Sequence, residues 1–141
     1  MTATPALGLA SPHLQPLLDD IRARRAALHR LGHIPQDIVE QFQKIGLYRA
    51  FVPEQFGGGA MTPMEFLRLI ETISAADGSA GWVASFGFAS KYLSSLPAST
   101  LATLYRETPD VVFAGAVFPP QPVTPEGKGY RVRGRWGFGS G

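Results

Sequence analysis

The sequence predicts a mainly α-helical protein in which the helices come first and a β-sheet begins near the end. Up to residue 107, apolar side chains recur three and four positions apart, as they do on the buried face of an amphipathic helix. After Thr108-Pro109 the pattern changes to an apolar run at 111–118 and a strict alternation at 130–136, which are typical of strands. Two or three strands are not stable as a sheet alone, so we expect a sheet that is incomplete within this chain. A small α+β domain that closes on itself is the alternative.

Three regions are expected from this change of pattern. Residues 1–11 are predicted to be a flexible tail, residues 12–108 a helical domain, and residues 109–141 the start of a β-domain. The tail lacks the basic start and apolar core of a signal peptide. We therefore expect a soluble, cytoplasmic protein.

Two glycines mark the C-terminal ends of the first two helices, which are expected over 12–31 and 35–45. Gly32 and Gly46 follow them, and glycine readily adopts the left-handed conformation that ends many helices.

The next helix is expected to begin at Thr62, which offers a hydroxyl cap, with proline at the first position and Glu65 at the third. The triplet Asp77-Gly78-Ser79 should end it. A helix at 80–96 follows and is apolar on nearly all sides, so it lies at the centre of the bundle or lines a pocket. A last short helix at 97–107 is capped by Ser99 or begins at Pro97. The predicted core consists of Phe42, Ile45, Phe66, Ile70 and Phe86.

The C-terminal part is predicted to contain a buried strand at 111–118 and a turn-rich loop at 121–129. A strand then follows at 130–136, with Tyr130, Val132 and Trp136 on one face and three arginines on the other. The glycine-rich end, 137–141, allows a flat ligand to approach the backbone closely.

Composition excludes several classes of function. The chain has no cysteine, so it has no disulfide, thiolate nucleophile or cysteine-ligated metal. With 13 basic and 11 acidic residues, the net charge of +2 is too small to indicate nucleic-acid binding. About 18 consecutive apolar residues would be needed to span a membrane, and no such run occurs. His29 and His33 have the spacing of metal ligands, but Gly32 interrupts the helix between them, and no metal site is predicted.

Two motifs carry a resemblance to a known family. They are Val52-Pro53-Glu54-Gln55-Phe56-Gly57-Gly58 and Ala75-Ala76-Asp77-Gly78-Ser79-Ala80-Gly81-Trp82. In this order they resemble the N-terminal helical domain of the acyl-CoA dehydrogenase superfamily. The strands after residue 109 look like the start of its barrel-like middle β-domain, so the resemblance covers residues 12–141.

Further details are similar to the flavin-dependent monooxygenases of that fold. These are Gly134-Arg135-Trp136-Gly137-Phe138, the following Ser140, and Gly78-Ser79-Ala80-Gly81-Trp82-Val83. The resemblance implies an oxygenase component that hydroxylates an aromatic or oxidises a heteroatom through a flavin hydroperoxide. Reduced FMN or FAD would come from a separate reductase. Two alternatives remain open: an acyl-CoA dehydrogenase, and a non-catalytic helical module that binds a partner through its unfinished sheet.

The same resemblance implies a set of site residues. Ser140 would hydrogen-bond near N5 of the flavin and is the candidate catalytic residue. Trp82 and Phe86 would form a substrate pocket, although their helical spacing alone is more typical of core residues. The residues expected to bind flavin are Gly115, Val117, Phe118, Trp136, Phe138 and Ser140.

Members of the family continue past the position of Gly141 with more β-domain and a four-helix bundle that completes the flavin site and forms a tetramer. The resemblance therefore implies that this chain is an N-terminal part, inactive by itself. It also implies a small-molecule substrate, a flavin reductase partner and a homo-oligomer, with no nucleic acid or membrane involved.

Overall fold

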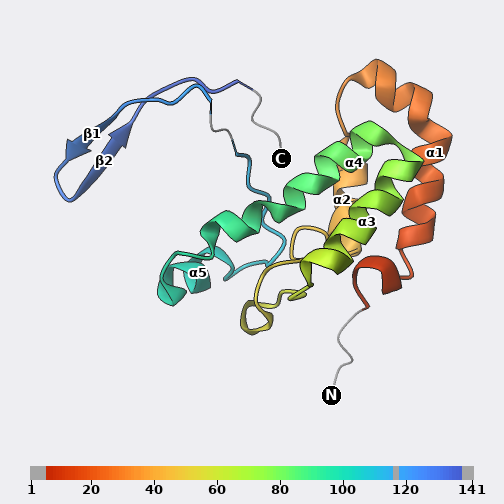
Figure 1. The fold of residues 1–141 in the computed structure, drawn as a ribbon, viewed down its shortest axis with the longest axis horizontal. Helices are drawn as coiled ribbons and strands as arrows, with labels where there is room; N and C mark the ends of the chain where they lie inside the picture. The colour runs from red at the N-terminus through yellow and green to blue at the C-terminus, as the bar shows by residue number, and fades with distance from the viewer. Residues whose placement is uncertain (1–5, 116–117, 138–141) are drawn as a thin grey trace.

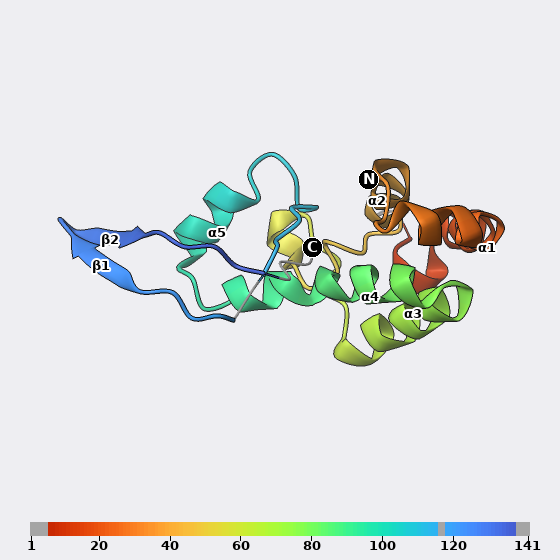
Figure 2. The same ribbon diagram turned by 90° about the horizontal axis from the view of Figure 1, so that it is seen from above.

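The computed structural model describes residues 6–115 and 118–137 of the chain. Its helices gather into one body, and a two-stranded hairpin extends away from them beyond α5 (Figures 1 and 2). This order of helices and strands confirms the predicted fold class. The α-helices are α1 (Leu14–Leu31), α2 (Gln36–Lys44), α3 (Pro63–Ala76), α4 (Gly78–Ser85) and α5 (Ala98–Leu104). The 3-10 helices are η1 (Gly8–Ala10), η2 (Glu54–Phe56) and η3 (Phe86–Leu93), and the strands are β1 (Val123–Glu126) and β2 (Gly129–Val132).

Local sequence signals account for the end of α1 and the start of α3. Gly32 follows α1 in the left-handed conformation, with φ of 72°, and its N–H donates to the Leu28 carbonyl at 3.1 Å. At the start of α3, the Glu65 N–H donates to Thr62 Oγ1 at 3.3 Å, while the Thr62 N–H donates to Glu65 Oε2 at 2.8 Å. This reciprocal capping box confirms the predicted start of α3.

The main core joins α1, α2 and α3 with α4. Phe42, Ile45 and Phe66 are buried in it as predicted, whereas Ile70 is half-buried at its edge and Phe86, also half-buried, is not part of it. The core also includes fully buried side chains from α1, α2, α3 and the segment that follows α2: Leu17, Ile21, Ile38, Leu47, Leu69 and Ile73.

Part of the segment predicted to be a flexible tail is ordered. Residues 8–10 form η1, and the Gly8 N–H donates to the Ile45 carbonyl at 2.8 Å. Gly8 is buried against the helical body. Spacing alone did not reveal this contact, because it joins two distant parts of the chain. Residues 1–5 lie outside the described residues.

The helix predicted at 80–96 differs in both its start and its geometry. It begins at Gly78, because Asp77 Oδ1 accepts a hydrogen bond from the Ala80 N–H at 2.9 Å and so caps it. After Ser85 the chain tightens into the 3-10 helix η3. The close packing of α4 on α3 requires Gly81, because a Cβ there would lie 2.0 Å from Ser74 Oγ.

The short helix α5 begins directly after Pro97, and the Ser99 side chain is not its cap. Leu101 and Tyr105 bury its inner side against Val52 in a second apolar cluster. No helix among the described residues is both long and apolar enough to cross a bilayer.

The strand predictions are partly wrong. Residues 111–114 and Phe118 have no strand structure, and residues 116–117 lie outside the described part of the chain. The predicted loop at 121–129 contains β1, and the strand predicted at 130–136 covers only Gly129–Val132. The two strands pair antiparallel around Gly127 and Lys128, and Gly127 has a φ of 60°. Glycine at the first position of a two-residue hairpin turn permits this conformation, which explains why the strands turn back there.

Candidate functional site

An apolar cavity of about 530 Å³ lies between η3 and the segment that follows α5. We call it the aromatic cavity. One wall comes from η3 and the end of α4, and the other from the irregular segment at 113–115. The lining residues are Ser85, Phe86, Phe88, Ala89, Tyr92, Leu93, Phe113, Ala114 and Gly115.

The 3-10 geometry of η3 builds the first wall. In a 3-10 helix, residues three apart lie directly above one another, so Phe86, Ala89 and Tyr92 form one row along the cavity. Phe88 lies beside this row, and its ring meets Tyr92 edge-on with centroids 6.0 Å apart. The sequence indicated this wall as part of a helix that was apolar on nearly all sides.

The second wall is held by contacts with α5 and the helical body. The Phe113 ring packs edge-on against Tyr105, with centroids 6.4 Å apart. Just before it, Asp110 is 7% exposed and accepts a hydrogen bond from Arg49 Nε at 2.8 Å. No sequence motif pointed to Phe113, Arg49 or Asp110, because their partners are far apart in the chain.

The buried charge of Asp110 also affects its neighbours. Burial, together with the nearby Asp110 carboxylate, raises the pKa of Tyr48 to about 12. The hydrogen bond from Arg49 to Asp110 raises the pKa of the Arg49 guanidinium, so Arg49 stays protonated at neutral pH. The chain that leads to the second wall therefore starts from an ion pair.

The structure brings together two of the site residues predicted from sequence. Phe86, expected in the substrate pocket, and Gly115, expected at the flavin, both line the aromatic cavity, from opposite walls. A Cβ at Gly115 would meet no atom within 4 Å, so a flat ligand can approach this backbone from the open side.

The other predicted site residues are not gathered there. The side chains of Phe118 and Trp136 are 73% and 40% exposed, and neither lines the cavity. Val117, Phe138 and Ser140 lie outside the described residues.

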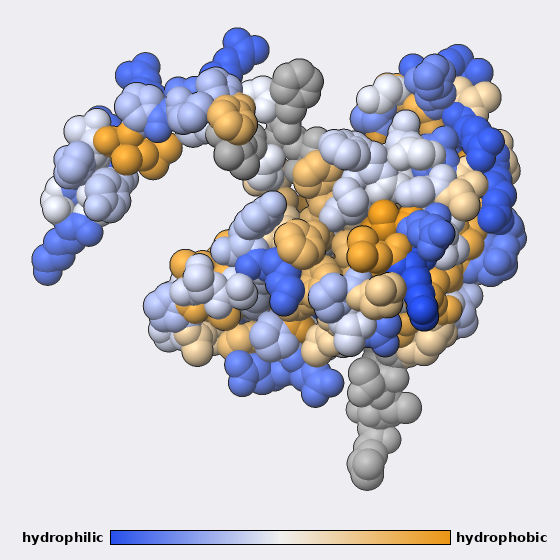
Figure 3. Space-filling model, viewed as in Figure 1, coloured by the Kyte–Doolittle hydropathy of each residue, from blue (hydrophilic) through white to orange (hydrophobic). Residues whose placement is uncertain are grey.

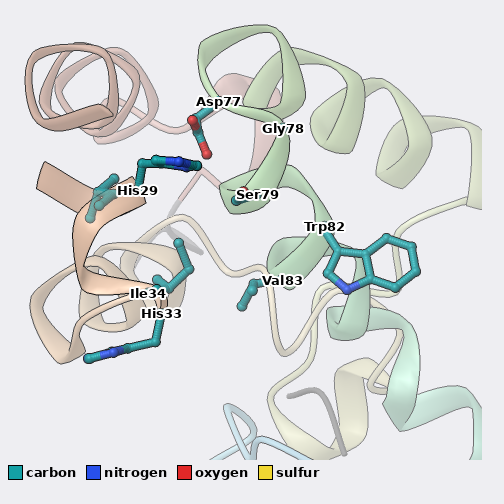
Figure 4. Close-up of a pocket in the computed structure, with 10 residues that line it drawn as sticks. His29, His33, Ile34, Asp77, Gly78, Ser79, Trp82 and Val83 are labelled. Atoms are coloured by element: carbon teal, nitrogen blue, oxygen red, sulfur yellow. The ribbon is translucent and has the colours of Figure 1, made fainter. Parts of the chain in front are cut away.

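Trp82 contributes to a different cavity, of about 490 Å³, between the end of α1 and the start of α4 (Figure 4). His29, His33 and Asp77 also line it, and in Figure 4 the Trp82 ring points away from the two histidines. Asp77 already caps α4 and lies 3.8 Å from Arg25 Nε. Within the described parts of the chain, no three His, Cys, Asp or Glu side chains come together as metal ligands would. Trp82 nevertheless touches the wall of the aromatic cavity, because its ring meets Phe86 edge-on at 5.5 Å.

The helical body matches the N-terminal domain of a known family. The family model for the acyl-CoA dehydrogenase N-terminal domain matches residues 14–96. The chain therefore belongs to the acyl-CoA dehydrogenase family, whose N-terminal domain it carries.

Within this family, the chain is similar to monooxygenases. It is 53% identical over 130 residues to indole-3-acetate monooxygenase of Acinetobacter baumannii, covering 91% of this chain and 33% of that protein. The indole-3-acetate monooxygenase of Pseudomonas putida is 47% identical over 144 residues, covering 100% of this chain and 37% of that protein. The crystal structure of 3-HSA hydroxylase from Rhodococcus sp. RHA1 superposes with a TM-score of 0.83 at 29% identity, covering 90% of this chain and 34% of that one.

More distant relatives carry names such as flavin-dependent monooxygenase and oxygenase component. The resemblance to flavin-dependent oxygenase components is thus confirmed. The chain spans about a third of the length of the curated relatives it matches.

Proposed function

We propose that this chain forms one side of the active site of a reduced-flavin-dependent monooxygenase that oxidises an aromatic substrate of the indole-3-acetate type. The observation that carries the proposal is the aromatic cavity, which joins Phe86 and Gly115 across two walls. The names of the two most similar relatives reported above support the indole-type substrate.

The described residues fit a flavin in one specific respect. Gly115 leaves open space beside the backbone at the mouth of a cavity with apolar walls. When bound, reduced flavin supplies two electrons to O₂, so that one oxygen atom enters the substrate and the other leaves as water. We propose that Gly115 and, on sequence resemblance alone, Val117, Phe118, Trp136, Phe138 and Ser140 contact the flavin.

The chain's own contribution is to hold the substrate and exclude water. Phe86, Phe88 and Tyr92 present aromatic surface on one wall, suited to a planar ring system. Apolar walls also keep water away from the reacting atoms, which favours transfer of oxygen to the substrate over its release as hydrogen peroxide. None of the described residues that line the cavity is charged, so these residues supply no ion pair for a substrate carboxylate.

Several finer features belong to this proposal and rest on the family resemblance. They are a helical domain at 12–108 and the start of a β-domain at 109–141, a separate reductase that supplies FMN or FAD, a cytoplasmic location and a tetrameric assembly.

A chimera tests the proposed function. Residues 1–141 would replace the aligned region of the Acinetobacter baumannii relative, joined to the rest of that enzyme. With reduced flavin and ¹⁸O₂, we expect the chimera to incorporate one labelled oxygen atom into indole-3-acetate. A chimera that folds and binds reduced flavin, but only reduces oxygen without modifying the substrate, would contradict the proposal.

Phe86→Ala in this chimera should raise the KM for indole-3-acetate about tenfold, because it removes an aromatic surface of the cavity wall. Leu9→Ala, at a 46% exposed side chain on η1, is the matched control and should leave the KM unchanged.

A further inference from the structure

The two walls of the aromatic cavity belong to different parts of the chain, so something must set the space between them. The first wall is the helix η3, whose geometry is fixed by its own hydrogen bonds. The second wall, at 113–115, follows residues 110–112, which have no regular secondary structure. Side-chain contacts therefore determine where the second wall lies.

Arg49 and Asp110 form the strongest of these contacts. Arg49 donates to Asp110 through both Nε, at 2.8 Å from Oδ1, and Nη2. Two parallel hydrogen bonds of this kind determine the orientation of both groups as well as their separation. The Asp110 N–H in turn donates to Thr108 Oγ1 at 3.1 Å. The second wall thus starts from a residue that is held from two sides.

Phe51, two residues after Arg49, makes the corresponding contact with the first wall. Its ring meets Phe88 edge-on with centroids 5.4 Å apart, and Lys91 Nζ lies 5.2 Å from its centroid. Between these two residues, Ala50 is fully buried in the main core. The segment 49–51 is therefore anchored in the helical body; it contacts the first wall through Phe51 and, through Arg49, the residue from which the chain runs to the second wall.

We propose that Arg49 is a positioning residue, which acts through Asp110 to set the distance between the two walls and so the fit of a planar aromatic ligand. The inference rests on the proposed function, because it takes the aromatic cavity to be the substrate site. Arg49 does not line the cavity, so its effect on the ligand passes through Asp110 and Phe113. Apolar side chains in place of a partly buried ion pair are often equally stable or more stable. An arginine–carboxylate pair with two hydrogen bonds, however, fixes the relative orientation of its two groups, which apolar contacts do not.

Electron paramagnetic resonance measures the position of the wall without any activity. The chain has no cysteine, so spin labels can be placed at Ala114→Cys, on the second wall, and Glu71→Cys, on the exposed side of α3. We expect a narrow distribution of distances between the labels, and a clearly broader one after Asp110→Asn or Arg49→Lys. Lysine keeps the charge of Arg49 but cannot form the two parallel bonds.

Glu126→Gln is the matched control, because it breaks another Arg–carboxylate pair with two hydrogen bonds, Arg131–Glu126, which lies in the exposed hairpin. Its distribution should stay narrow. An unbroadened distribution in a folded Asp110→Asn or Arg49→Lys variant, with helix content verified by circular dichroism, would overturn the proposal. Arg49→Lys decides the question if Asp110→Asn does not fold.

Kinetics of the chimera then separate positioning from stability. A loosened wall weakens ligand binding, so Arg49→Lys should raise the KM for indole-3-acetate about tenfold with little change in kcat. A purely structural role would lower the fraction of folded enzyme, and so the apparent kcat, at constant KM, which would count against the proposal. If the parent chimera is inactive, the proposed function fails, and the distance distributions alone decide the role of Arg49.

Discussion

The helical body and the hairpin are built from similar apolar residues, but they bury them to very different extents. In the helical body, Phe42 and Ile38 have no exposed surface. In the hairpin, Val123 and Val132 lie directly opposite each other, yet they are 52% and 57% exposed. Figure 3 shows apolar surface of the hairpin open to solvent beside the helical part.

The hairpin has one polar and one apolar face. Val123 with Val132, and Pro125 with Tyr130, form the apolar face, while Arg131 on the other face pairs with Glu126. An exposed pair of this kind contributes little to stability, and an isolated hairpin is at best marginally stable in water. The stability of the described structure therefore resides in the helical body, and the hairpin should unfold with little cost.

Replacing a core phenylalanine gives the largest expected difference between the two regions. Phe42→Ala leaves a cavity in a fully buried site and should lower the free energy of unfolding by about 3–5 kcal/mol. Tyr130→Ala, at a side chain 72% exposed in the hairpin, should change it by less than about 0.5 kcal/mol. Urea unfolding followed by circular dichroism measures both, and equal midpoints for the two variants would contradict this division.

Alkaline pH should weaken the helical body through Tyr48. Its pKa is raised to about 12 by burial and by Asp110, against about 10 in the unfolded chain. The contribution of neutral Tyr48 is thus complete below about pH 10 and is lost as pH rises towards about 12, a total of about 2–3 kcal/mol. Burial raises the pKa of Tyr105 as well, so both tyrosines act in the same direction.

Unfolding free energies measured from pH 9 to pH 11 test this. Tyr48→Phe should reduce the alkaline loss, with Tyr105 accounting for what remains, and Tyr92→Phe, at an exposed ring, should keep the full loss. If Tyr48→Phe and the parent lose stability in parallel, Tyr48 is not the group responsible.

The contrast between the two regions also separates what the sequence could predict from what it could not. Helix ends depend on nearby residues, so Gly32 and the Thr62–Glu65 box were predicted correctly. The strands were placed less well, because a strand's bounds depend on its partner. The apolar run at 111–118 resembled a buried strand, but its described residues pack as irregular chain on α5 through Val111 and Phe113.

The candidate site shows the same limit. Phe86 was predicted as a pocket residue by family resemblance. The helix that contains η3 was predicted because its apolar residues are neighbours in the sequence. Arg49 and Asp110 are 61 residues apart, and an isolated arginine and aspartate in a sequence do not indicate a pair. Gly115 on the second wall was also predicted by resemblance, but the contacts that hold this wall required the three-dimensional structure.

A smaller effect is expected from the local signals that begin or turn each element. Thr62→Ala removes a capping box from α3 and should cost about 1 kcal/mol of global stability, because α3 is part of the cooperative core. Gly127→Ala is the counterpart in the hairpin, where alanine is strained at a φ of 60°. We expect this substitution to abolish the cross-strand contacts between β1 and β2, which NMR would measure, without shifting the urea midpoint. A shifted midpoint would mean that the hairpin and the helices unfold together.

The smallest effect is expected for Val132→Thr on the apolar face of the hairpin. Val132 is already more than half exposed, so in the 141-residue polypeptide the substitution should change the free energy of unfolding by less than about 0.5 kcal/mol. In the chimera described above, the same substitution reports whether additional chain covers this face. A buried valine replaced by threonine places a hydroxyl in an apolar contact, which costs about 1–3 kcal/mol. A loss of unfolding free energy that occurs only in the chimera would show that additional chain covers this face of the hairpin there. A loss above about 1 kcal/mol in the 141-residue polypeptide would mean that the hairpin already contributes to its stability.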